Sequence, residues 1–387
     1  MNRLDRHILF RFLTNFVLLF VIMFLFAAAI DLVLALDEFV EAADAAVGEN
    51  ASFGARTAKL LALALDFQAP RFFQFYAFLH GMLAVGAMAF TLARMHKHRE
   101  LVAMLAAGIS MKRIAMPFVV GMFVLGLAQL VNQEIFLPRV APLLVRGHDQ
   151  IGQQTLGAFP VDFTRDSRGT LLQAASFDPS AQRMDGVTIL ERDDAGRTRR
   201  RITAATAEWR AAADGTDSGW VLQDGASVEL DVRAGSDAVA PSVQMSRGTV
   251  DFVPTDLSPR VLVIRRHGSF ASMLSLPQLR EILAAPAAVD RPSLIASLER
   301  YAFSRFSSVI VNVLLMWLAL PAFLLRGPGN MMKQSLICAA ITLPAVIGSA
   351  IFMLVEIGPI PAALSVFLPA LVLLLVVIGQ WMLMVRS

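Results

Sequence analysis

The residues with the clearest chemical potential gather in one polar segment between two strongly apolar passages. This segment runs from Ala93 to Ile114, with the sequence "ARMHKHRELVAMLAAGISMKRI". It begins with a basic stretch, Arg94 to Arg99, whose simplest role is contact with anionic lipid headgroups. A carboxylate, Glu100, follows at the point where a short helix can begin. Charged groups of these types can hold an anionic lipid or a partner protein.

We expect a helix over "ELVAMLAAG", because a carboxylate in the first turn complements the helix dipole and glycine suits a left-handed C-terminal stop. Glu100 supplies the carboxylate and Gly108 the glycine. One face is apolar at i, i+3 and i+4 spacing, through Leu101, Met104 and Leu105. Such a helix, lying parallel to a membrane, is either a simple connector or the part that fits a groove on a partner.

The sequence lacks the common motifs of nucleotide hydrolysis and metal catalysis. "GPGNMMKQS" is basic and contains glycine, but it does not have the spacing of a phosphate-binding P-loop, and HExxH does not occur. His96 and His98 are the only close histidine pair, and their basic neighbours would repel a metal ion. His80 is expected to be a hydrogen-bonded interior group rather than a proton relay. We therefore expect no catalytic residue, metal or cofactor.

The elements that would position these residues are membrane-spanning helices. The chain of 387 residues is 56% hydrophobic, with a mean hydropathy of +0.61, which is too apolar for an ordinary soluble domain. A helix of ~20 apolar residues crosses the hydrocarbon core of a bilayer. Six runs are this long, in two groups of three, near residues 12–36, 72–93, 114–137, 306–325, 335–355 and 360–385. The first has no small-residue cleavage site, so we expect an uncleaved span rather than a signal peptide.

The charges of the loops predict the orientation. Four segments on one side hold eleven Lys or Arg residues, whereas the two loops on the other side hold three. Because positive residues mark the cytoplasmic side, we expect both termini and the Ala93–Ile114 segment in the cytoplasm. The basic segments are residues 1–11, 94–113, 326–333 and 386–387, and the other two are residues 37–71 and 356–359. The pI of 9.4 partly reflects this bias and does not indicate nucleic-acid binding.

The long polar stretch after the third span is predicted to form a periplasmic antiparallel β-domain. Its short runs are rich in β-branched residues and bounded by turn residues. A helix is expected at "SLPQLREILAAP", with Ser275 as its N-cap. The candidate strands are "GTLLQAASF", "DGVTILER", "RRRITAATAEW", "GWVLQDGASVELDV", "SVQMSRGTVDF" and "RVLVIRR". The predicted organisation is 1–137 with three transmembrane helices, 138–304 with the β-domain and connecting helices, and 305–387 with three more transmembrane helices.

Few ionisable residues fall inside the spans. An ion-coupled transporter would need such groups near the membrane centre. Asp31, Glu134 and Glu356 lie instead towards the outer ends of their spans. We therefore expect any transport to draw its energy from outside the bilayer.

The Ala93–Ile114 segment resembles the cytoplasmic loop of the LptF/LptG (YjgP/YjgQ) lipopolysaccharide-export permeases. That loop has a basic lead-in, then S-E-L, small residues and A-A-G-I-S; Arg99 stands here in place of the serine. The stretches "LDRHILFRFL", "LPRVAP", "SLPQLREIL" and "SRFSSVIVNVLLMWLALP" also fit the family layout, as does the 3 + domain + 3 arrangement. "LDRHI" and "QWMLMVR" are more similar to the G-type subunit.

The resemblance implies a non-catalytic permease subunit of the bacterial inner membrane. In that family two six-span subunits assemble with a dimeric cytoplasmic ABC ATPase. The pair takes lipopolysaccharide from the inner membrane and passes it to a periplasmic bridge protein. The β-domain is a β-jellyroll, or β-taco. By this resemblance the helix near residues 99–110 is the coupling helix that receives the motion of the ATPase.

The sequence departs from the family at the outer end of the first span. G-type members have lysines there, which suit lipid A phosphates, whereas this chain has Asp37 and Glu38. The remaining candidates for headgroup contact are Arg71, Arg139 and Arg146, whose alternative role is to anchor span ends at the headgroup layer.

A second function stays open at this point. The chain can also be a non-transporting membrane anchor whose β-domain scaffolds another envelope protein. A permease should have an apolar cleft in its β-domain, whereas a scaffold should have a closed β-core and an exposed edge or patch.

Overall fold

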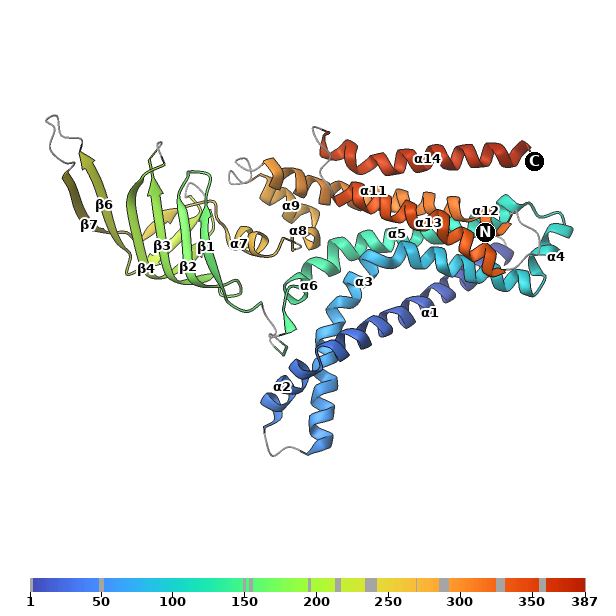
Figure 1. Ribbon diagram of the computed structural model, residues 1–387, viewed down its shortest axis with the longest axis horizontal. Helices are drawn as coiled ribbons and strands as arrows, with labels where there is room; N and C mark the ends of the chain where they lie inside the picture. The colour runs from blue at the N-terminus through green and yellow to red at the C-terminus, as the bar shows by residue number, and fades with distance from the viewer. Residues whose placement is uncertain are drawn as a thin grey trace. The chain divides into compact units, whose positions relative to one another are not determined.

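The structure, a computed structural model, consists of two compact units (Figure 1). The first joins Met1–Val140 to Ala296–Ser387, and the second is Ala141–Ile295. The residues described are 3–48, 52–148, 151–152, 156–193, 196–212, 217–233, 242–268, 270–284, 292–324, 331–354 and 360–386.

The first unit is helical, and six helices among its described residues are long and apolar enough to cross a membrane. The predicted six spans are thereby confirmed. Helix α1 begins, and α14 ends, at the same end of this unit as α4 (Figure 1). The elements are α1 (Arg3–Leu34), α2 (Leu36–Val47), α3 (Phe53–Lys97), α4 (Glu100–Ala106), α5 (Met111–Val131), the π-helix η1 (Asn132–Phe136), α6 (Leu137–Leu144), α11 (Pro292–Ala319), α12 (Pro321–Leu324), α13 (Met331–Leu354) and α14 (Ala362–Arg386).

Aromatic side chains hold α1, α3 and α5 together. The rings of Phe12 and Phe118 meet edge to face with centroids 5.5 Å apart. Gly121 permits this approach, because a Cβ there would lie 2.6 Å from the Phe12 ring. Phe20 contacts Tyr76 of α3 in the same way, at 5.6 Å. Edge-to-face pairs of this kind add to the stability given by burial.

The last helices pack on α11. Val311 and Leu315 lie in a buried cluster with Ala370 and Leu373 of α14. The Ser307 hydroxyl, which is fully buried, donates a hydrogen bond to the Val366 carbonyl at 2.7 Å.

The region expected as a loop between the first two spans is a helical hairpin. It consists of α2 and the first turns of α3, and the rings of Phe39 and Phe67 pack at 5.5 Å across it. The Ser52 hydroxyl accepts a hydrogen bond from the Ala55 N–H and caps α3. This region was treated as a loop because it lies between two predicted spans, but it is rich in alanine, which has the highest helix propensity. Asp37 and Glu38 occupy the first turn of α2, where carboxylates are favoured.

The described part of the second unit contains an antiparallel sheet of eight strands, which confirms the predicted β-domain. Its order is β1-β2-β3-β4-β5-β8, and β6 pairs with both β4 and β7. The sheet divides at β4, because residues 200–203 pair with β6 and residues 206–210 pair with β5. The strands are β1 (Phe159–Arg165), β2 (Leu171–Asp178), β3 (Arg183–Arg192), β4 (Thr198–Arg210), β5 (Gly219–Gln223), β6 (Ala226–Arg233), β7 (Ser242–Thr249) and β8 (Phe252–Pro254).

Three strand predictions differ from the structure, and β1 was not predicted. "SVQMSRGTVDF" is interrupted at Val250 and Asp251, between β7 and β8. "GWVLQDGASVELDV" is divided into β5 and β6 because Asp224 adopts a left-handed φ of 54°, and Gly225 approaches the Val250 carbonyl too closely for a Cβ. "RVLVIRR" is not a strand but α7 (Pro259–Arg266). The Ser258 hydroxyl accepts from the Val261 N–H, and Pro259 stands in the first turn, where its missing N–H costs nothing.

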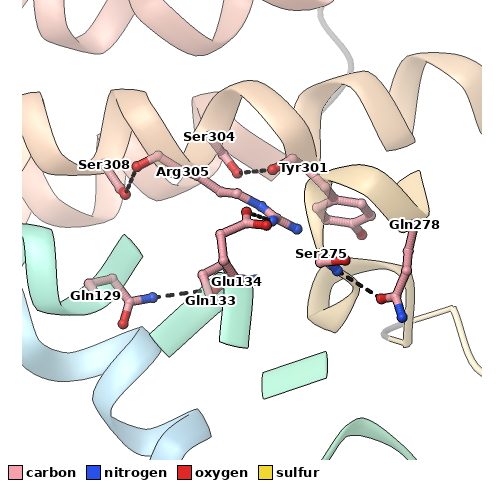
Figure 2. Close-up of polar contacts among 9 residues, drawn as sticks. All are labelled: Gln129, Gln133, Glu134, Ser275, Gln278, Tyr301, Ser304, Arg305 and Ser308. Carbon is pink, nitrogen blue, oxygen red and sulfur yellow. Dashed lines mark hydrogen bonds and ion pairs between the residues drawn. The ribbon is translucent and has the colours of Figure 1, made fainter. Parts of the chain in front are cut away.

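The second unit also contains the short helices α8 (Phe270–Met273) and α9 (Leu276–Leu283). Ser275 caps α9 as predicted, and its N–H donates to Gln278 Oε1 at 3.0 Å (Figure 2). One face of the sheet is filled by fully buried side chains, among them Phe177, Met184 and Trp220. The Trp220 indole donates to the Leu257 carbonyl at 3.1 Å. These side chains form a buried core on this face.

Candidate functional site

Helix α4 is a separate short helix with defined ends. Arg99 precedes it with a left-handed φ of 57°, which turns the chain out of α3. Gly108 follows it with φ 77°, and the Ile109 N–H returns to the Met104 carbonyl at 3.1 Å. The predicted helix and its glycine stop are present.

The inner face of α4 is fixed to the chain's own core. Leu101 is 2% exposed and belongs to the buried cluster of α1, α3 and α5, against which Met104 and Leu105 also pack. Arg11 Nη1 of α1 donates to Glu100 Oε2 at 2.6 Å. The apolar face that the sequence offered to a partner thus lies against the chain itself.

The outer face of α4 is exposed and consists of small residues. Val102 is 50% exposed, and Ala103, Ala106 and Ala107 are also exposed. Because these side chains are small, a partner protein can pack close to the backbone of α4. This face was not selected from the sequence, because Val102 and three alanines carry no strong apolar or charge signal.

Two further contacts tie the surroundings of α4 to other spans. His96 Nε2 at the end of α3 lies 2.9 Å from the Phe323 carbonyl of α12. Arg113 at the start of α5 pairs with Asp5 of α1 at 3.9 Å. The helix is thereby placed where the ends of α1, α3, α5 and α12 meet.

A second polar cluster lies where α5 passes into η1. Figure 2 shows the Glu134 carboxylate directed at the Arg305 guanidinium of α11, with which it forms an ion pair. The Arg305 side chain is only 3% exposed, and that of Glu134 is 29% exposed. Asn132 Nδ2 donates to the Phe73 carbonyl of α3 at 2.9 Å. Pairing of this kind is what a buried charge requires.

His80 is a hydrogen-bonded interior group, as expected. Its Nε2 lies 3.1 Å from Asn312 Nδ2 of α11, and its Nδ1 lies 3.1 Å from the Tyr76 carbonyl. Together with Glu134–Arg305, this contact joins the first three spans to α11. Glu356, the third acidic residue noted in the sequence, lies outside the described residues.

A comparison with known protein families gives a match over nearly the whole chain. A family model described as "Lipopolysaccharide export system permease LptF/LptG" matches residues 6–385. The chain belongs to the LptF/LptG permease family. A search of curated proteins finds no match. As a member of this family the chain is a multi-pass inner-membrane permease for lipopolysaccharide export, not a classical enzyme. Among its described residues, no group of three His, Cys, Asp or Glu side chains has the arrangement of a metal site.

The three arginines predicted for headgroup contact are in different surroundings in this LptF/LptG permease. Arg71 pairs with Asp31 of α1 and lies 3.9 Å above the Phe67 ring. Arg146 is buried in the second unit, where its Nε donates to the Leu143 carbonyl at 3.2 Å. Arg139 of α6 is exposed.

Proposed function

We propose that this permease is one subunit of an ATP-driven exporter that extracts lipopolysaccharide, or a related glycolipid, from the inner membrane and passes it to a periplasmic bridge protein. Its partners are a dimeric cytoplasmic ABC ATPase and a second six-span permease subunit of the same family. The observation that carries the proposal is α4, whose inner face is anchored to three spans while its outer face is open.

Helix α4 is suited to transmit motion from a motor. Glu100 and Leu101 fix it to α1 and to the buried cluster, so a force on its outer face acts on the spans directly. The described carboxylates Asp31 and Glu134 are held by arginines, which fits an energy source outside the bilayer. In this scheme the permease hydrolyses nothing.

The orientation proposed places both termini and α4 in the cytoplasm and the β-unit in the periplasm, following the excess of positive residues on one side. A cysteine at exposed Gly196 should react with a membrane-impermeant thiol reagent in intact spheroplasts, and a cysteine at His98 should not. The opposite pattern would contradict the orientation and the docking of a cytoplasmic motor.

For the substrate, we propose that Arg139 contacts a phosphate of the glycolipid headgroup. It is exposed, whereas Arg71 is held by Asp31 and Arg146 is buried. Bidentate hydrogen bonding makes arginine well suited to phosphate. Arg139→Gln should reduce glycolipid crosslinking and transport at unchanged abundance of the protein in the membrane. Normal transport by this variant would place phosphate recognition elsewhere.

The test of the whole proposal is affinity purification in mild detergent. The wild-type chain should recover an ABC ATPase and a second six-span protein. Val102→Asp or Ala106→Asp, on the outer face of α4, should lower recovery of the ATPase, because a charge would be carried into the contact. Ala205→Asp is the matched control, since Ala205 is exposed on β4 of the second unit.

A second candidate is a non-transporting anchor that scaffolds an envelope protein. One observation favours it: the described inner face of the sheet is filled by the chain's own side chains, including Phe177 and Trp220. If the chain is only an anchor, its affinity purification should recover no ATPase. Recovery of the ATPase, together with its loss in Val102→Asp but not in Ala205→Asp, would exclude the anchor.

A further inference from the structure

The two faces of the sheet carry different charges where β3, β4, β6 and β7 lie side by side. Residues directly opposite in antiparallel strands share a face, and successive residues alternate between faces. One row of opposite residues is Glu191–Arg200–Glu229. The adjacent row, on the other face, is Leu190–Arg201–Val228–Arg247.

The charged residues of the first row form ion pairs. Arg200 stands between two glutamates, and its Nη1 lies 3.9 Å from Glu191 Oε2. Its Nη2 also donates to Ser227 Oγ at 3.3 Å. Glu229 is further engaged by Arg199, at 3.5 Å. A ligand would have to break these contacts to bind here.

The second row keeps its positive charge. Arg201 and Arg247 are both exposed, and they flank the partly buried Val228. Two strand separations of about 4.8 Å place their backbones roughly 10 Å apart. No carboxylate of the described residues forms an ion pair with either arginine.

Neighbouring positions on this face add hydroxyl groups. Thr188 lies opposite Thr203, and Thr203 lies opposite Ala226, which in turn faces Thr249. These positions are two residues along each strand from the arginine row, so they share its face. We name the surface formed by Arg201, Arg247, Thr188, Thr203 and Thr249 the arginine face. It combines phosphate-binding guanidinium groups with hydroxyls that suit sugars.

We propose that the arginine face binds the phosphorylated saccharide headgroup of a glycolipid. Guanidinium groups bind phosphate oxygens through two parallel hydrogen bonds, and they are less strongly hydrated than an ammonium group. Threonine hydroxyls donate to and accept from sugar hydroxyls. This inference rests on the proposed function for the presence of the glycolipid, and it adds a second contact for the headgroup, on the second unit.

The experiment uses the full-length permease in detergent with a photoreactive residue at Val228, between the two arginines. The probe is purified rough lipopolysaccharide. Arg201→Gln with Arg247→Gln should reduce crosslinking about tenfold, the scale expected for losing charge-assisted hydrogen bonds to phosphate. Removing the phosphates of the probe with phosphatase should have the same effect. Arg183→Gln is the matched control, because Arg183 is a partly exposed arginine of the same sheet that is already paired with Asp185.

Crosslinking that is insensitive to the double substitution, or to phosphatase, would overturn the inference. So would equal competition by phosphatidylglycerol, because that result would assign the surface to any anionic lipid rather than to a saccharide. The outcome is separable from the proposed function, because the double variant should still recover the ATPase. Failure of the wild-type chain to recover the ATPase would refute the proposed function. The crosslinking experiment would still show whether the arginine face binds the phosphorylated headgroup.

Discussion

The ion pair between Arg11 and Glu100 permits a direct test of how α4 is held. The perturbation is a charge exchange: Arg11→Glu, Glu100→Arg, and both together. The Arg11 Nη1 to Glu100 Oε2 distance is 2.6 Å, and the two side chains are 35% and 33% exposed. This exposure places the pair between a surface ion pair, worth ~0.2–1 kcal/mol, and a shielded charged hydrogen bond, worth ~1.5–3 kcal/mol.

We therefore expect a coupling free energy of about 1 kcal/mol, which is roughly a fivefold change in the equilibrium for local opening of α4. Each single variant also places two like charges together, so its α4 should open more readily than wild type. The double variant should return towards the wild-type opening. The measurement is amide hydrogen exchange of α4 in the purified permease, with recovery of the ATPase as a second readout.

Single variants that exchange like wild type, or a double variant that restores nothing, would refute the anchoring role of this pair. The two readouts also separate anchoring from partner contact. If the exchange is restored but ATPase recovery is not, Glu100 also contacts the partner, as the sequence suggested. If both are restored, Glu100 acts only as an anchor.

Two other predictions concern stability. Burial raises the pKa of Asp166 above its ordinary value of 3.8, and the negative charge of Asp256 adds a smaller increase. The second unit should therefore lose stability as the pH rises from this ordinary value through the higher pKa of Asp166 in the folded protein. Asp166→Asn should flatten this dependence in thermal unfolding followed by tryptophan fluorescence, and an unchanged slope would contradict the assignment. Gly81→Ala should destabilise the protein by about 1–3 kcal/mol, because the new Cβ would collide with the Asn312 amide. Gly348→Ala, with open space around it, is its control for thermal unfolding in detergent; equal effects would show that the contact between α3 and α11 is not tight.

The features that the sequence predicted are those set by nearby residues. Six spans follow from the length of apolar runs, and α4 follows from a carboxylate at one end and Gly108 at the other. The α2 hairpin was missed because the residues between the first two spans were treated only as a connecting loop, although their alanines favour a helix. The strand predicted at "RVLVIRR" was wrong because the cap from Ser258 outweighed β-propensity.

The sequence alone did not predict which charged side chains form ion pairs with one another. Arg11 and Glu100 are separated by 89 residues, and Glu134 and Arg305 by 171. No spacing rule joins positions so far apart, so Glu100 was considered as the first-turn carboxylate of a connector or coupling helix, and Arg305 was not considered. Packing also decides which face of α4 points inward, because Leu101 lies in the buried cluster with α1, α3 and α5. The sequence alone does not show this contact.

The π-helix at Asn132–Phe136 has a consequence for the evolution of this segment. Its hydrogen bond from the Leu137 N–H to the Asn132 carbonyl spans one residue more than an α-helical bond, so it accommodates an inserted residue within the third span. Each residue turns an α-helix by about 100°. Losing Asn132 or Gln133 would therefore rotate all that follows by about a quarter turn and withdraw Glu134 from Arg305. A substitution in this stretch alters one side chain, whereas a change in its length shifts every residue that follows. Relatives that preserve the ion pair should therefore preserve the residue count between Asn132 and the start of α6 more strictly than the residue types within it.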